Sequence, residues 1–129
     1  MGIADLTLSE RVTLVSLART VIRADGKIST REAAAMQELA QAVGPARFVE
    51  AIAAAQQQAP SAEDARRHAA SVTAPRTRQL IYRLIHYMAT SDGMSPNELA
   101  ELQWLAALWE LPVDPMTAEL LPDSPAPPA

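Results

Sequence analysis

The 129-residue chain lacks cysteine and has little glycine and few aromatic residues. The absence of cysteine excludes disulfides, thiolate zinc sites, iron–sulfur clusters and a cysteine nucleophile. Because alanine, leucine and glutamine are abundant while only four glycines interrupt the chain, the composition favours helix over sheet. A chain of this length suits one domain with one modest core, and we expect an all-α fold.

Long apolar runs and a basic N-terminus are also missing. No apolar run approaches the roughly 18 residues that a membrane-spanning helix needs. The segment "MGIADLTLSERV" carries acidic residues where a secretory signal would carry basic ones. A cytoplasmic protein without an integral membrane segment is the simplest interpretation.

Basic residues are absent from the C-terminal part of the chain. All eleven lie at or before Arg83, whereas seven acidic residues lie between Asp92 and Asp123. This distribution argues against nucleic acid as a partner of the C-terminal part. It suits a cation, a basic partner or simply a solvated surface.

An internal repeat organises the chain. Residues 11–44 align with residues 78–110, and each copy reads as a helix, an Asp-Gly corner and a second helix, which is an αα-hairpin. Apolar residues recur three to four positions apart in both copies, as in Leu14, Leu17 and Val21. Capping boxes are expected to open three helices, at Thr7 with Glu10, Ser29 with Glu32, and Ser95 with Glu98.

The segments outside the repeat are expected to be helical as well. Residues 45–58 read as a helix with Phe48, Val49 and Ile52 directed inward, and residues 61–72 as a short helix capped by Ser61. A last short helix is expected from Asp114 to about Leu121. We therefore predict about seven helices, arranged as two pseudo-symmetric αα-hairpins packed as a bundle with linking helices. Residues 1–121 form the domain, and the proline-rich residues 122–129 are expected to be a disordered tail.

The first Asp-Gly corner, "RADGKISTRE", shares part of its spacing with an EF-hand calcium loop. With Asp25 at position five, Gly26 takes position six and Glu32 takes the bidentate position twelve. Positions one and three are Val21 and Arg23, which supply no carboxylate where calcium needs oxygen. A standard EF-hand is therefore excluded.

Two interpretations of the corners stay open. In the first, Asp-Gly forms the turn, and serine and glutamate cap the next helix without any metal. In the second, Asp25, Glu32, Asp92 and Glu98 meet across the pseudo-twofold axis and share an ion, for which all-oxygen ligands favour calcium or magnesium over zinc.

Residues for catalysis are sparse. The only histidines are His68 and His86, and neither has a glutamate three residues before it, as a di-iron bundle requires. The sequence also lacks a glycine-rich phosphate loop and a Gly-x-Ser-x-Gly elbow. We therefore expect no enzymatic activity.

Trp104 stands out among the few aromatic residues. It aligns with Glu38 of the first repeat and should project from the polar side of its helix, whereas Trp109 aligns with Val43 and should be core. An exposed tryptophan is a candidate anchor for a protein partner or for self-association. The alternative is that the C-terminal helix covers it.

The doubled pattern, with "ADGKIS" in one copy and "SDGMSPNE" in the other, resembles the TerB-like family of helical domains over most of residues 7–121. The resemblance implies an all-helical, pseudo-twofold, non-enzymatic domain associated with tellurite resistance and other stress responses. It also implies an acidic surface that binds metal, calcium above all, and that would map onto Asp25, Glu32, Asp92 and Glu98. We expect a binding or scaffold protein with a protein partner, or alternatively a calcium sensor or buffer.

Overall fold

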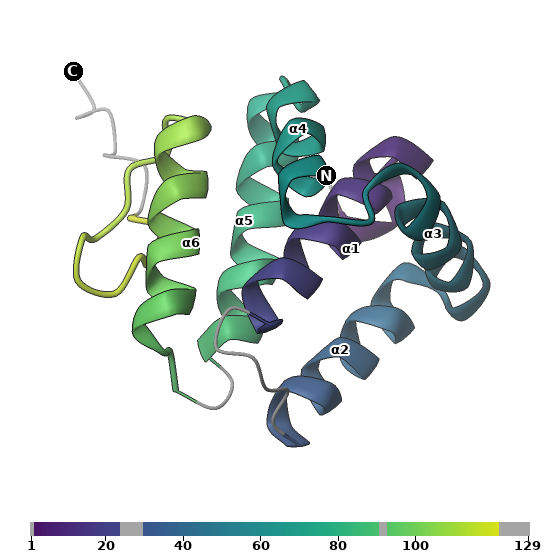
Figure 1. The fold of residues 1–129 in the computed structure, drawn as a ribbon, viewed down its shortest axis with the longest axis horizontal. Coiled ribbons are helices and arrows are strands. Elements are labelled where there is room, and N and C mark those ends of the chain that lie inside the picture. The colour runs from purple at the N-terminus through teal and green to yellow at the C-terminus, as the bar shows by residue number, and fades with distance from the viewer. Residues whose placement is uncertain (1, 24–29, 91–92, 122–129) are drawn as a thin grey trace.

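The computed structural model describes residues 2–23, 30–90 and 93–121, with the backbone alone for Ala4, Ile22 and Glu32. All regular elements in these ranges are helices, which confirms the all-α prediction (Figure 1). They are a short 3-10 helix η1 (Ile3–Asp5) and six α-helices: α1 (Leu8–Ile22), α2 (Thr30–Val43), α3 (Pro45–Gln58), α4 (Ala62–Ser71), α5 (Pro75–Thr90) and α6 (Pro96–Leu108).

Helix α1 is the centre of the bundle. It contacts α3, α4, α5 and α6, while α2 lies mainly against α3, α5 and η1. Residues 12 to 18 of α1 are all buried, so the helix has hardly any solvent-facing side along this stretch. Its buried Ser16 donates a hydrogen bond to the backbone carbonyl of Val12 at 2.7 Å, which satisfies the hydroxyl without a distant partner. A helix can be buried on every side when its side chains are apolar or form their hydrogen bonds within the helix itself.

The helix caps predicted at Thr7, Ser95 and Ser61 are present in the structure. Thr7 accepts a hydrogen bond from the Glu10 N–H while Glu10 accepts one from the Thr7 N–H, and Ser95 and Glu98 form the same reciprocal pair. Ser61 caps α4 as expected. The box expected at Ser29 and Glu32 lies outside the described residues and side chains.

Gly44 joins α2 to α3 in a conformation with φ of 105°. Residues with a side chain rarely adopt this region, so glycine allows α3 to start directly after α2 ends. The helix expected over residues 45–58 therefore begins where the sequence placed it.

The predicted helix from Asp114 to Leu121 is wrong. The segment instead forms a loop closed by an isolated bridge between Val113 and Leu120. The carboxylate of Asp114 accepts hydrogen bonds from the backbone N–H groups of Met116 and Thr117, which favours a turn. Ala118 then has φ of 55°, which ends any helical continuation. The described residues therefore contain six of the seven expected α-helices, and the short η1 is an additional element.

Two further expectations fail or find no support. Val49 was expected to face inward but is 66% exposed, because its neighbour Phe48 takes the inward position on α3.

The two predicted hairpins pack differently. The second hairpin packs α5 against α6, whereas the principal contacts of α2 are with elements other than α1. The predicted pseudo-symmetry of the two hairpins is thus not confirmed, and residues 122–129 lie outside the described part of the chain.

Candidate functional site

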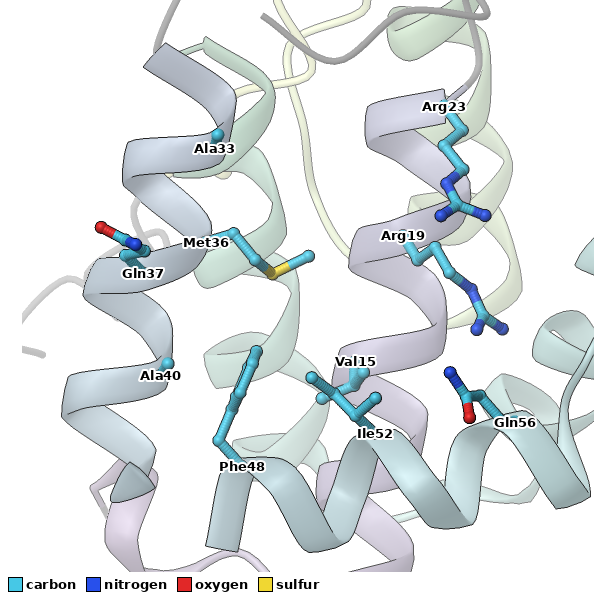
Figure 2. Close-up of a pocket in the computed structure, with 10 residues that line it drawn as sticks. All are labelled: Val15, Arg19, Arg23, Ala33, Met36, Gln37, Ala40, Phe48, Ile52 and Gln56. Atoms are coloured by element: carbon cyan, nitrogen blue, oxygen red, sulfur yellow. The ribbon is translucent and has the colours of Figure 1, made fainter. Parts of the chain in front are cut away.

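An open groove lies where α1, α2 and α3 meet (Figure 2). Its volume is about 380 Å³. Each of the three helices contributes to its lining, which consists of Val15, Arg19, Arg23, Ala33, Met36, Gln37, Ala40, Phe48, Ile52 and Gln56.

The middle of the groove is apolar. Met36 extends from α2 toward α1, and Phe48 and Ile52 rise from α3 below it (Figure 2). Met36 and Ile52 are only partly buried, although Ile52 was expected to be directed inward. They line the groove because α2 makes its principal contacts with elements other than α1.

One end of the groove is basic. Arg19 lies in the last turn of α1 and Arg23 is the C-cap residue of that helix, and both line this end of the groove. Arg19 donates a hydrogen bond through Nη2 to the carbonyl of Ala59 at 2.6 Å, and Gln56 lies beside it in Figure 2. Among the described residues no carboxylate lines the groove or forms an ion pair with either arginine.

A second surface surrounds Trp104 on α6. The guanidinium of Arg66, from α4, lies 4.7 Å from the centre of the Trp104 ring and also pairs with Glu101 at 2.9 Å. We call Arg66, Glu101 and Trp104 the Trp104 face. The tryptophan is half-buried, and Arg66 on α4 covers part of its ring in a cation–π arrangement. Between α6 and residue 121, where the described part of the chain ends, no helix forms to cover it in the way that the alternative expectation required.

The acidic residues proposed as metal ligands are only partly placed. Asp25 and Asp92 lie outside the described residues, and the side chain of Glu32 is not described. Glu98 is 2% exposed, and its Oε1 accepts a hydrogen bond from the Ser95 N–H at 2.9 Å. Its carboxylate thus serves the cap of α6. Within the described ranges no group of three or more histidine or acidic residues could hold a metal ion.

The two histidines, His68 and His86, both take part in contacts within the fold. His86 stacks on Tyr82, and its Nε2 lies 3.1 Å from the carbonyl oxygen of Thr117. His68 is half-buried on α4, where its backbone carbonyl accepts a hydrogen bond from Ser71. The contact of His86 joins the C-terminal segment to α5, and the contact of His68 closes the last turn of α4.

Tyr82 is a residue that the sequence interpretation missed. It is fully buried and donates a hydrogen bond from its hydroxyl to the carbonyl of Ala118. Burial raises the pKa of this phenol well above its usual range. The available signal was its position directly after Ile81, at the edge of the apolar side of α5.

None of the helices in the described ranges is both long and apolar enough to span a bilayer. This finding agrees with the absence of long apolar runs in the sequence.

Comparisons with known proteins point to one family. A family model described as "Tellurite resistance protein TerB" matches residues 11–117. A crystal structure of a protein of unknown function from Porphyromonas gingivalis W83 is similar with a TM-score of 0.66 and 23% identity, over 88% of this chain and 86% of that chain. At this identity the likeness concerns the fold. No curated protein matches the chain.

Proposed function

Because the chain belongs to the TerB family, we propose that it is a non-enzymatic binding or scaffold protein of a bacterial stress response related to tellurite resistance. It acts in the cytoplasm and recognises a protein partner through the Trp104 face. The observation that carries this proposal is the stacking of Arg66 on the half-buried Trp104 ring.

The Trp104 face has the composition of an interface hot spot. Tryptophan and arginine are the residues most enriched where truncation weakens protein–protein complexes. Since the Arg66 side chain is held both by the ring and by Glu101, it loses little further freedom when a partner binds. The C-terminal part of the sequence, which includes α6, carries acidic but no basic residues, and this suits a partner with basic residues.

The first prediction concerns Trp104→Ala. We expect this change to weaken partner capture or self-association at least tenfold, the effect of losing a hot-spot side chain. Because the ring is only half-buried, the free energy of unfolding should fall by no more than about 1–2 kcal/mol. Quantitative pull-down and sedimentation velocity measure the binding, and thermal unfolding measures the stability.

The matched control is Tyr87→Ala, which removes an exposed aromatic side chain from α5 outside the Trp104 face. It should leave binding unchanged. Equal loss of binding in both variants, or unchanged binding in Trp104→Ala, contradicts the proposal.

We also propose, as the second candidate function, a divalent-cation sensor or buffer in which Asp25, Glu32, Asp92 and Glu98 bind calcium. Its support is the family membership, since an acidic metal-binding surface is what the resemblance implies, together with the deeply buried carboxylate of Glu98. That carboxylate already holds the cap of α6, so ion binding would have to use its remaining coordination capacity.

Glu98→Gln tests this second proposal. Glutamine also forms capping boxes, so the variant keeps the cap while it removes the charge. We expect millimolar calcium to raise the melting temperature of the natural protein through preferential binding to the folded state, and to raise that of Glu98→Gln much less. If no backbone amide shifts near residues 25–32 and 92–98 at about 10 mM calcium, the sensor proposal is wrong, because even weak extracellular calcium modules bind at about 10⁻³ M.

A further inference from the structure

We propose that the groove between α1, α2 and α3 binds a medium-chain fatty acid. The alkyl chain lies along Met36, Phe48 and Ile52, and the carboxylate lies at Arg19 and Arg23. The basic end of this groove adjoins the Trp104 face, because Arg19, Arg23 and Glu101 line a neighbouring pocket together. The groove itself is lined by other residues and adds a ligand to the proposed scaffold function.

The size and lining of the groove suit a small amphipathic molecule. Its volume of about 380 Å³ lies at the lower end of the range of roughly 300–1,000 Å³ that small-molecule sites occupy. Met36 and Ile52 remain partly in contact with water although they lie beside the buried Phe48. An alkyl chain that covers them removes apolar surface from water, which is favourable in proportion to the area covered.

The basic end of the groove determines the polar part of the ligand. Arg19 uses one hydrogen bond on the carbonyl of Ala59, and a guanidinium has five N–H donors, so donors remain for an anion. Arg23 is exposed one helical turn further along. Arginine pairs with carboxylate through two parallel hydrogen bonds. The described acidic residue nearest to this end is Glu101, which lines a neighbouring pocket with both arginines but pairs with Arg66 at 2.9 Å.

A peptide suits the groove less well than a fatty acid. The side chains around the apolar middle, Met36, Phe48 and Ile52, offer no hydrogen-bond partners for a peptide backbone. The amide of Gln37 is directed away from Phe48, at the outer edge of the groove (Figure 2). A peptide would therefore leave polar backbone groups unpaired against apolar side chains, which costs free energy that an alkyl chain does not lose.

The test is a titration with sodium decanoate, below its micellar concentration, followed by calorimetry and by methionine methyl NMR. We expect saturable 1:1 binding that shifts the methyl signal of Met36 and leaves those of the buried Met88 and the exposed Met116 unchanged. Octanoate should bind roughly tenfold more weakly, because two fewer methylene groups are buried. Uncharged 1-decanol should bind roughly three- to tenfold more weakly, because it cannot pair with the arginines.

Two substitutions locate the site. Ala33→Trp places a large side chain in the groove and should abolish binding. Ala42→Trp changes another exposed alanine of α2, one that does not line the groove, and should leave binding unchanged. Arg23→Ala should weaken decanoate binding roughly three- to tenfold and leave decanol binding unchanged, while Arg76→Ala, which removes an exposed arginine of α5, should change neither.

Several results would overturn the proposal. They are the absence of saturable binding, equal affinity for decanoate and decanol, shifts of Met88 or Met116 in place of Met36, and equal effects of the two tryptophan substitutions. If a peptide with a C-terminal carboxylate binds more tightly than decanoate, the groove is a peptide site. If the protein dimerises with increasing concentration and decanoate does not reverse this, a second copy occupies the groove. The Met36 measurement uses the natural protein, so it decides the question even if Ala33→Trp fails to fold.

Discussion

Trp109→Ala is expected to lower the free energy of unfolding by about 3–5 kcal/mol, the usual cost of truncating a buried tryptophan. In a domain of this length such a loss corresponds to a fall in melting temperature of roughly 10–20 °C. Trp109 is 2% exposed and lies just after the last turn of α6. Its indole Nε1 donates a hydrogen bond of 2.8 Å to the carbonyl of Ala69, 40 residues away on α4. The residue therefore joins two helices by both packing and hydrogen bonding.

Trp109→Phe separates the two contributions. Phenylalanine keeps an aromatic ring in the core but leaves the carbonyl of Ala69 without this donor, which should cost about 1–3 kcal/mol. Urea unfolding followed by circular dichroism measures all three proteins, and an unchanged m-value establishes that stability alone has changed. A loss below about 1 kcal/mol in Trp109→Ala would show that the core around residue 109 closes over the missing side chain.

The burial of Trp109 was predictable because the repeat aligns it with Val43, and both residues are in the core. The capping boxes at Thr7 and Ser95 were equally predictable. The capping boxes depend on residues three positions apart, and the burial of Trp109 follows from comparing two segments of the same sequence, so both could be predicted without knowing the packing of the helices.

The C-terminal segment was not predictable in the same way. Asp114-Pro115 is a reasonable start for a helix, and the apolar residues after it have helical spacing. Its structure is instead set by distant partners: Ala118 accepts a hydrogen bond from Tyr82, and Pro115 accepts one from Gln103 at 2.6 Å. A helix of eight residues is marginal in isolation, so a few tertiary contacts are enough to select another conformation.

The groove was hidden from the sequence for a different reason. The spacing of Met36, Phe48 and Ile52 correctly identifies the apolar sides of α2 and α3. Periodicity does not reveal whether a further helix covers these sides. Arg23 was interpreted only as a residue that opposes calcium binding, and its position beside an apolar groove follows from the packing of three helices.

Tyr82→Ala is the second substitution with a large expected effect, again about 3–5 kcal/mol of unfolding free energy. Tyr82 is the largest of the fully buried side chains in the described part of the chain, and it holds the loop of residues 111–121 through Ala118. Tyr82→Phe removes only the hydroxyl and should cost about 1–2 kcal/mol. Hydrogen exchange should then accelerate for the Ala118 amide, which bonds to the carbonyl of Asp114, before it accelerates in α1. If the loop and α1 lose protection together, the loop does not open separately from the core.

The raised pKa of Tyr82 also makes stability depend on alkaline pH. Burial favours the neutral phenol in the folded protein, so its contribution is fully present below the unfolded pKa of about 10 and is lost as pH rises above that value. Tyr87 adds a weaker dependence of the same sign, because its hydrogen bond to Glu38 raises its pKa while its ring is exposed to screening solvent. Urea midpoints measured between about pH 8 and pH 11 should therefore fall steeply above pH 10 in the natural protein and in Tyr87→Phe, but less steeply in Tyr82→Phe. The same slope in all three would mean that Tyr82 reaches solvent and ionises without unfolding, which contradicts its fully buried position.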